Sequence, residues 1–269
     1  MIAIFISAHK NLNQVRRLIN SLKHDEIDIY MHVDSKCELN SEDFKDIYLL
    51  SQRFDIKWGD LSQLNSFIMG LKKISDTKKY EHIFVISGQD YLLKPVKELV
   101  SFLHQNRNKI FLKYDEITSK DIAGRYLEYH TNNRYIDAIL RRIMPKRKIF
   151  DVKTYFGSCW FAITDDAVKY IIFQYDKYVK KLKYTICMDE VFVHTVLLNS
   201  KFKNDIVNDN LFYIDWSDHI KGLNNGNPNI LKTENFDKII KSGKYFARKF
   251  DSEVDSEILD KLDKYRGDL

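Results

Sequence analysis

Short apolar runs alternate with helical patterns along the first part of the chain, and this alternation constrains the fold more than any other feature. The runs 2–7, 28–33 and 82–87 are a few residues long and end in polar residues, which is typical of buried strands. Apolar residues recur at helical spacing in 15–22 and 64–71. Strands that alternate with helices form βαβ units. We therefore predict an α/β fold, with a mostly parallel central sheet and helices on both faces.

Several boundaries can be placed from local signals. Asn11 is a capping residue ahead of the first helix, and Pro95 suits the start of a later one. The run 110–114 is expected to form the next strand. In the second half, 188–198 is expected to form one helix, because apolar residues recur along it at helical spacing.

The composition excludes several classes of chain. With only 9 Gly and 3 Pro in 269 residues, the chain is not collagen-like, linker-like or of low complexity. It is 44% hydrophobic, enough to bury a core, and no apolar run reaches the roughly 18–20 residues of a membrane span. Three widely spaced cysteines, Cys37, Cys159 and Cys187, exclude a disulfide scaffold and suit a reducing compartment. We expect a soluble, cytoplasmic single domain over 1–269.

Charge and missing motifs narrow the function. The net charge of +5 is small against 43 basic and 38 acidic residues, so charge alone does not argue for a nucleic-acid partner. The chain lacks G-x-G-x-x-G after the first run, the P-loop, H-E-x-x-H, paired C-x-x-C and G-x-S-x-G. It also lacks Asp-x-Asp, the pair with which many sugar-nucleotide enzymes hold a divalent cation. We expect no cofactor and no metal.

Polar residues at the predicted strand ends are candidate ligand contacts, because parallel sheets bind ligands beyond the carboxyl ends of their strands. Asp34 follows the second strand, where it could bind a ribose or cap a turn. The stretch 87–91 places a hydroxyl, an amide, a carboxylate and a phenol at another strand end. It could bind several sugar hydroxyls, or it could be an ordinary turn.

Two charged pairs also allow two interpretations each. Asp189-Glu190 opens a predicted helix, where carboxylates stabilise the positive helix end. The same placement could hold a general base at the edge of a cleft. Arg248-Lys249 lies between two phenylalanines; it could be a solvated face, or it could hold a departing diphosphate without a metal.

Eight motifs, taken in order, resemble one family, the core-2/I-branching β-1,6-N-acetylglucosaminyltransferases, which also includes peptide O-xylosyltransferases. The motifs are Ser-Ala-His-Lys (7–10), His-Val-Asp (32–34), Trp-Gly-Asp (58–60), Ser-Gly-Gln-Asp-Tyr (87–91), Gly-Ser-Cys-Trp-Phe-Ala-Ile-Thr (157–164), the stretch 189–200 that begins Asp-Glu-Val-Phe, Ile-Asp-Trp (214–216) and Phe-Ala-Arg-Lys-Phe-Asp (246–251). The resemblance spans nearly the whole chain and is that of a compact bacterial member.

The resemblance implies a GT-A-like nucleotide-sugar fold and inverting, metal-independent transfer from a UDP-sugar. Within the single domain, 1–115 would be the nucleotide-binding half and 116–269 the acceptor and catalytic half. GlcNAc is the expected donor sugar, and the acceptor would be a hydroxyl of a glycan or a lipid-linked glycan. A role in bacterial surface polysaccharide synthesis follows by analogy.

The resemblance also assigns residues. Glu190 would be the catalytic base, with Met188 standing where many members have proline before Asp-Glu. The further assignments are Arg248, Lys249 and Lys232 to the diphosphate, Ala8, His9 and Asp34 to the nucleoside, and Gln89, Asp90, Trp160, Asp189 and Trp216 to the donor and acceptor sugars.

Two other functions stay open. One is a metal-dependent or retaining GT-A transferase. The other is a non-catalytic module that binds a polyanion or a membrane through the basic segment 141–148. In a transferase, the same segment would line the acceptor site or make a peripheral contact with the inner face of a membrane.

Overall fold

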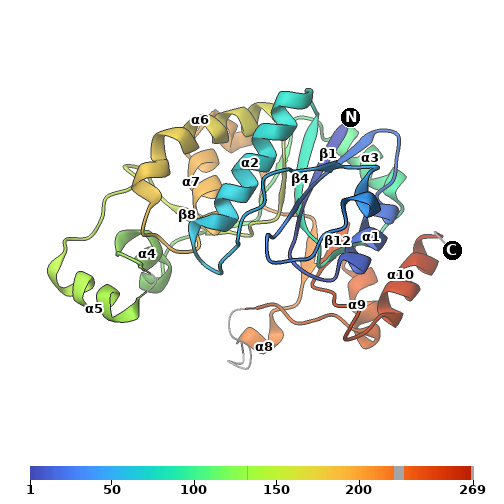
Figure 1. The fold of residues 1–269 in the computed structure, drawn as a ribbon. Coiled ribbons are helices and arrows are strands. Elements are labelled where there is room, and N and C mark those ends of the chain that lie inside the picture. Colours follow the sequence, from blue (N-terminus) through green and yellow to red (C-terminus); the bar gives the residue numbers. More distant parts are fainter. Residues whose placement is uncertain (132, 221–226, 268–269) are drawn as a thin grey trace. The chain divides into compact units, whose positions relative to one another are not determined.

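The computed structural model describes residues 1–131, 133–220 and 227–267 of the chain (Figure 1). It contains two compact units, each assembled from separate stretches of sequence. The first consists of Met1–Ser51, Phe84–Arg107 and the chain from Leu211 onward. The second consists of Gln52–Ile83 and Asn108–Asn210. The predicted single domain with halves 1–115 and 116–269 stays a prediction.

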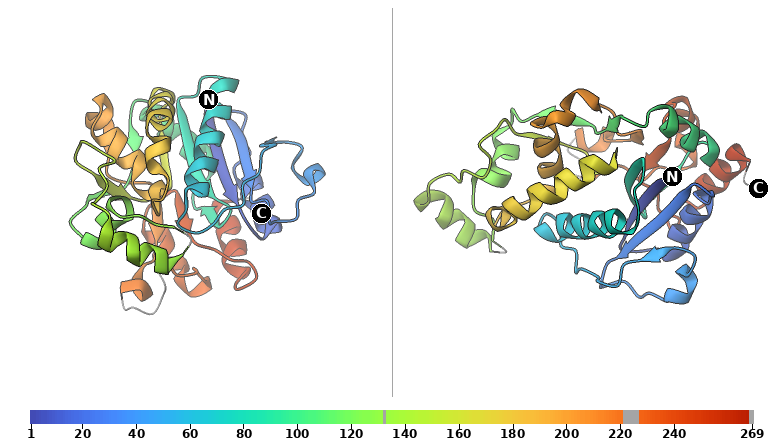
Figure 2. Two further views of the ribbon diagram at one scale, coloured as in Figure 1. Left: turned by 60° about the vertical axis from the view of Figure 1, so that its left-hand side comes forward. Right: turned by 90° about the horizontal axis from the view of Figure 1, so that it is seen from above.

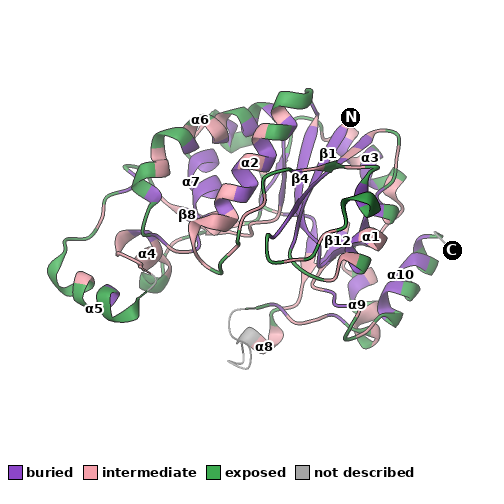
Figure 3. Cartoon of the chain, viewed as in Figure 1, coloured by how far each residue is buried: buried purple, intermediate pink, exposed green. Residues whose placement is uncertain are grey.

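Parallel strands form the centre of the first unit. They lie in the order β4 (His82–Ser87), β1 (Ile2–Ala8), β2 (Ile27–Val33) and β3 (Tyr48–Leu49), and β4 enters the unit at Phe84. β1 and β2 pair in parallel along their whole length, and β3 pairs in parallel with β2. Every residue of β1 and β4 is buried, as Figure 3 shows in purple. The apolar runs predicted as buried strands are confirmed.

A smaller sheet in the first unit joins distant motifs. β12 (Phe246–Arg248) pairs in parallel with β11 (Phe212–Ile214) and antiparallel with β5 (Asp90–Leu92). In this register Arg248 lies opposite Asp90. Two motifs more than 150 residues apart in sequence therefore meet on neighbouring strands.

The helices of the first unit follow the local signals in the sequence. Asn11 caps α1 (Leu12–Ser21), because its side chain accepts a hydrogen bond from the backbone of Gln14. α3 begins directly after Pro95, as predicted. The remaining helices and short helical turns of the unit are α3 (Val96–Gln105), α8 (Ser217–Ile220), α9 (Phe236–Lys241), α10 (Glu257–Arg266), η1 (Ser41–Phe44) and η4 (Thr233–Asn235).

The second unit contains short strands. β6 (Ile110–Phe111) pairs in parallel with β10 (Ile206–Val207) and antiparallel with β9 (Phe161–Ile163). β7 (Tyr114–Glu116) pairs antiparallel with β8 (Tyr155–Gly157). The predicted single strand over 110–114 is thus wrong: the chain leaves one sheet after Phe111 and enters another at Tyr114.

Helices of the second unit pack on one another. α2 (Leu61–Thr77) and α6 (Asp165–Leu182) lie side by side in both views of Figure 2. The hydroxyl of Tyr175 on α6 donates to Asn65 on α2 over 2.5 Å. The other helical segments are α4 (Lys120–Leu127), α5 (Arg134–Ile143), α7 (Phe192–Leu198), η2 (Met188–Glu190) and η3 (Lys201–Asp205).

The predicted helix over 188–198 is two segments. In η2 and the residue that follows it, the backbone N–H groups of Glu190 and Val191 bond three residues back, to Cys187 and Met188. The bonding changes to four residues back at Thr195, which donates to Val191. Glu190 therefore lies on a tight turn ahead of α7, not within a regular helix.

The predicted mixed α/β class with mostly parallel strands is confirmed. Among the described residues, no helix is both long enough and apolar enough to span a bilayer.

Gly157 of β8 lies close to the backbone of Lys113, and this close approach generates a stability prediction. A Cβ atom there would lie 2.0 Å from the carbonyl oxygen of Lys113 and 2.9 Å from Nε2 of His194. Because backbone cannot yield as a flexible side chain can, Gly157→Ala should lower the free energy of unfolding by about 2–3 kcal/mol. Urea unfolding followed by circular dichroism measures this.

Gly124→Ala on α4 is the matched control. Its new Cβ would meet its nearest neighbour at 3.6 Å, an ordinary contact. Alanine also favours a helix over glycine by about 1 kcal/mol, so this variant should be as stable as the parent or more so. Equal stability of the two variants would contradict the close packing at Gly157.

Candidate functional site

The carboxyl ends of β1 and β2 form one edge of the first candidate site. Ala8 ends β1, and its carbonyl accepts a hydrogen bond from the backbone N–H of Asp34 over 2.8 Å. Asp34 is buried, with 2% of the residue exposed. Its carboxylate accepts a hydrogen bond from the backbone N–H of Lys36 over 2.9 Å, and the Lys36 ammonium group lies 3.0 Å away. The structure therefore brings the predicted nucleoside residues Ala8 and Asp34 together, with Asp34 also shaping its own turn.

Positive charge gathers beside this edge. Burial lowers the pKa of His9, and so do the neighbouring charges of Lys10, Arg248 and Lys249, against an opposing effect of Asp34. Burial and the charges of Arg248 and Lys10 likewise lower the pKa of Lys249. Neighbouring positive charges lower a group's pKa because they repel its protonated form, so these side chains lie close together. A bound anion would reduce this repulsion. The loop after β1 and the end of β12 thus form a cationic cluster.

Asp90 is the buried partner of Arg248. Its Oδ1 lies 3.1 Å from Nη1 of Arg248, and its Oδ2 accepts from the backbone of Ser87 over 2.7 Å. Asp90 is fully buried, which raises the pKa of its carboxyl group to about 6 against the opposing charge of Arg248. We predicted a sugar contact for Asp90. That role stays a prediction; in the structure both carboxylate oxygens lie beside protein groups, and the carboxylate positions the Arg248 guanidinium.

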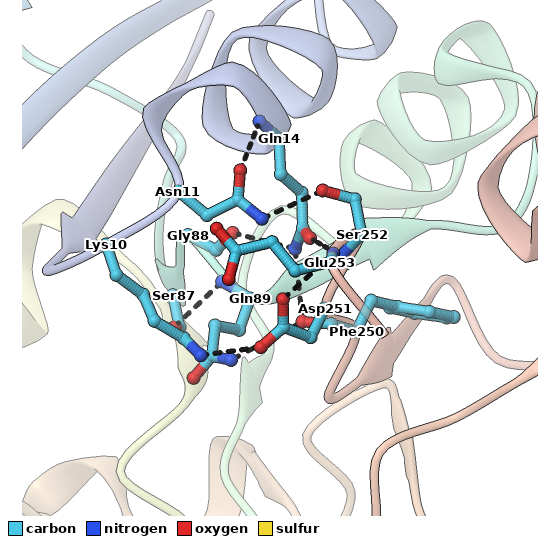
Figure 4. A network of polar contacts seen from close by, with 10 residues as sticks. All are labelled: Lys10, Asn11, Gln14, Ser87, Gly88, Gln89, Phe250, Asp251, Ser252 and Glu253. Carbon is cyan, nitrogen blue, oxygen red and sulfur yellow. Dashed lines mark hydrogen bonds and ion pairs between the residues drawn. The ribbon is translucent and has the colours of Figure 1, made fainter. Parts of the chain in front are cut away.

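A hydrogen-bond network fixes the two motifs that carry these residues (Figure 4). The Gln14 amide nitrogen donates to the carbonyls of Gly88 and Phe250, over 3.3 and 3.1 Å. The backbone N–H of Phe250 donates to the carbonyl of Gln89 over 2.8 Å. The Gln89 side chain, 9% exposed by residue, donates in turn to Phe250 over 3.4 Å. Lys10 completes the network with an ion pair to Asp251 at 2.5 Å.

Gln14 was not predicted as a site residue. Its side chain donates to the carbonyls of Gly88 and Phe250 and accepts from the backbone N–H of Ser252, three groups that lie far from it in sequence.

Lys232 and Lys249 line one open cavity of about 620 Å³ in the first unit. Asp215 and Ser217, on either side of the half-exposed Trp216, line it as well. The structure therefore brings both predicted diphosphate lysines to one cavity and places Trp216 at its border.

The second candidate site lies in the second unit, around Glu190. Arg125 Nη1 donates to Glu190 Oε2 in an ion pair that joins α4 to η2. Glu190 is partly exposed, as a residue that meets a substrate must be. Arg125 was not predicted as a site residue, because its acidic partner lies 65 residues away in sequence.

The turn before Glu190 is held on both sides. The backbone N–H of Ile186 donates to the carbonyl of Arg125 over 3.0 Å, and that of Cys187 donates to Gly59 over 2.6 Å. Cys187 itself adopts a left-handed conformation, φ 52°. Many family members have proline at the position of Met188, and proline restricts the backbone. In this chain the hydrogen bonds of Ile186 and Cys187 restrict the backbone just before that position.

Asp189 and Trp160 belong to the same region. Burial and the charge of Glu190 raise the pKa of Asp189 to about 7, while a hydrogen bond with the Cys159 side chain acts in the opposite direction. Trp160 packs edge-on against Phe67, with ring centroids 5.7 Å apart. The 157–164 motif and the 189–200 motif therefore meet, as a shared site requires.

A comparison with protein families identifies the family of this chain. The family model described as "Branch: Core-2/I-Branching enzyme" matches residues 2–240. The chain belongs to the core-2/I-branching enzyme family. The family match includes Asp34, Asp90 and Glu190, and it ends before Arg248.

Individual relatives and solved structures are also similar to this chain. The chain is 29% identical to xylosyltransferase 2 of Rattus norvegicus over 293 residues and 28% identical to that of Homo sapiens over 290, covering 97% of this chain in each case. It spans only a third of their length, 33% in each. A crystal structure of S. aureus TarS 1–349 matches with a TM-score of 0.41 and 14% identity, over 76% of this chain and 56% of that one.

The buried Asp90 carboxyl group predicts a specific pH dependence. Its pKa is raised from 3.8 to about 6, so the folded state holds the proton more tightly than the unfolded state. Asp90 then favours folding most below pH 4, and this contribution is lost as the pH rises through 6. Asp90→Asn cannot titrate, so its free energy of unfolding relative to the parent should rise by about 2 kcal/mol between pH 4 and 7.

Urea unfolding of both proteins across this pH range measures the effect. The exposed Asp25→Asn, which lies outside the helices and strands, serves as the control and should not reproduce the effect of Asp90→Asn. Parallel curves for Asp90→Asn and the parent would show that Asp90 titrates normally.

Proposed function

We propose that this chain transfers a sugar from a UDP-sugar to a hydroxyl group of a glycan acceptor, with inversion at the anomeric carbon and without a metal. The observation that carries the proposal is the cluster of Lys10, Arg248 and Lys249 beside His9 and Asp34, with Arg248 at the end of β12 and Lys249 lining the cavity. Such a cluster suits a diphosphate next to a ribose, at the sheet edge where α/β folds bind nucleotides. Family membership supports the same chemistry.

In the proposed reaction, Glu190 takes the proton of the acceptor hydroxyl as its oxygen attacks the anomeric carbon. The bond between that carbon and the diphosphate oxygen breaks, and UDP leaves on the opposite face, which inverts the configuration. Arg248 and Lys249 neutralise the charge that develops on the diphosphate. Asp90 holds the Arg248 guanidinium in place, and Arg125 orients the Glu190 carboxylate.

Donor and acceptor are the finer part of the proposal. GlcNAc is the donor that the sequence resemblance favours, and the names of the relatives make xylose the second donor to test. The acceptor class, a glycan or lipid-linked glycan of a bacterial surface polysaccharide, rests on the resemblance. A cytoplasmic location is part of the same proposal.

Substitutions at Glu190 and Lys249 should separate catalysis from binding. Glu190→Gln removes the base, so transfer should fall about 10²–10⁴-fold while the Kd for UDP stays within about twofold. Lys249→Ala removes a charge-assisted contact to phosphate, so UDP should bind about 10–100-fold more weakly. Titration calorimetry with UDP and a transfer assay with UDP-GlcNAc and UDP-xylose measure both effects.

Two exposed charges provide matched controls. Asp166→Asn in the second unit and Lys45→Ala in the first should leave both the Kd and the rate unchanged. Full turnover by Glu190→Gln would remove Glu190 from the mechanism. Unchanged UDP affinity in Lys249→Ala would remove the diphosphate site.

Metal independence has its own test. Transfer should be unaffected by excess EDTA, because protein cations take the place of a divalent ion at the diphosphate. Activity that disappears in EDTA and returns with Mn²⁺ would support the metal-dependent alternative. The anomeric configuration of the product, measured by NMR, distinguishes inversion from retention.

A further inference from the structure

The exposed face of α5 is apolar, which is unusual for a helix of a globular unit. Four large apolar residues of this helix, Tyr135, Ile136, Ile139 and Ile143, are between 46% and 70% exposed. At 100° per residue they fall on one side of the helix. Figure 3 shows α5 largely in green, the colour of exposed residues. In an ordinary amphipathic helix this apolar side would face the core.

The opposite, polar side of α5 holds it to the second unit. Asp137 is the buried residue of the helix, and its carboxylate accepts from the backbone and the hydroxyl of Thr131, over 2.6 and 2.7 Å. Asn133 caps the first turn. Arg141 forms an ion pair with Glu128 at 3.1 Å. The buried side of α5 is therefore the side of Asp137, and its apolar side is exposed.

Basic residues surround the apolar side. Between residues 134 and 148 the only acidic residue is Asp137, which is buried and hydrogen-bonded. The same stretch contains six basic residues, and all except the half-buried Arg147 are exposed: Arg134, Arg141, Arg142, Lys146, Arg147 and Lys148. An apolar strip with cationic borders combines the two attractions by which a helix binds an anionic bilayer surface.

We propose that α5 docks on an anionic membrane surface, with Tyr135, Ile139 and Ile143 entering the interface and the basic residues on the lipid phosphates. Charge complementarity favours this occupant over a second copy of the chain. Arg141 and Lys148 pair with Glu128 and Asp151, so a symmetric α5–α5 contact would mainly bring together two sets of Arg134, Arg142 and Lys146, with no exposed acid on α5 to balance them. The proposal stands on α5 alone and does not depend on sugar transfer.

Vesicle sedimentation tests the proposal with the full chain. The protein should pellet with vesicles of phosphatidylcholine and phosphatidylglycerol, but at least about tenfold less with phosphatidylcholine alone. Ile139→Asp places a charge in the apolar strip and should reduce the bound fraction about tenfold or more. Arg142→Glu should weaken binding too, and binding of the parent should decrease as salt rises.

Phe173→Asp on α6 is the matched control, because Phe173 is 56% exposed, close to the 57% of Ile139. It should bind vesicles like the parent. Circular dichroism and thermal unfolding confirm that all three variants stay folded, and UDP titration without vesicles should give one Kd for all of them. This titration separates failure of the docking proposal from failure of the proposed sugar transfer.

Three results would overturn the proposal. They are no pelleting with anionic vesicles, equal pelleting with phosphatidylcholine alone, and full binding by Ile139→Asp. Self-association of the parent that Ile139→Asp abolishes, without vesicle binding, would assign the face to a second copy instead.

Discussion

The buried ion pair between Asp90 and Arg248 is the interaction on which the arrangement of the first site depends. It joins β5 to β12, so it also fixes where Lys249 leaves the strand and enters the cavity. Each of two cations at this site has its own acid, because Arg248 pairs with Asp90 and Lys10 pairs with Asp251. Lys249 adds a further positive charge, and its pKa is lowered by burial and by the charges of Arg248 and Lys10. The hydrogen bond from the Ser87 backbone N–H and the charge of the Arg248 guanidinium partly offset the desolvation of the buried Asp90 carboxylate.

Much of the fold could be predicted because its signals are local. Asn11 caps α1 through a residue three positions away, and the apolar runs of β1, β2 and β4 are legible within a few residues. The helix predicted over 188–198 was wrong because the spacing of its apolar residues is regular while its backbone hydrogen bonding changes along the chain. The pattern through Val191 is continuous, yet the backbone passes there from bonds three residues back to bonds four residues back. Hydrophobic periodicity reports burial, and it does not report which carbonyl an N–H group reaches.

The site was predictable as a set of motifs but not as a set of contacts. Arg248, Lys249 and Lys232 could be named from the resemblance, and the structure brings the two lysines to one cavity. Gln14 and Arg125 could not be named, because their partners lie far away in sequence and no local pattern marks them. Asp90 could be named but its role could not. A carboxylate at a strand end looks the same in sequence whether it meets a sugar or a buried guanidinium.

The same limit explains why α5 is informative only in the structure. Its sequence shows a strong separation of apolar and charged residues, and the ordinary inference is that the apolar side is buried. The structure reverses that inference: Asp137, which accepts two bonds from Thr131, is the buried residue of α5, while Tyr135, Ile139 and Ile143 are exposed. The basic residues beside the exposed apolar strip then form one amphipathic surface with it, which the net charge of the chain does not indicate.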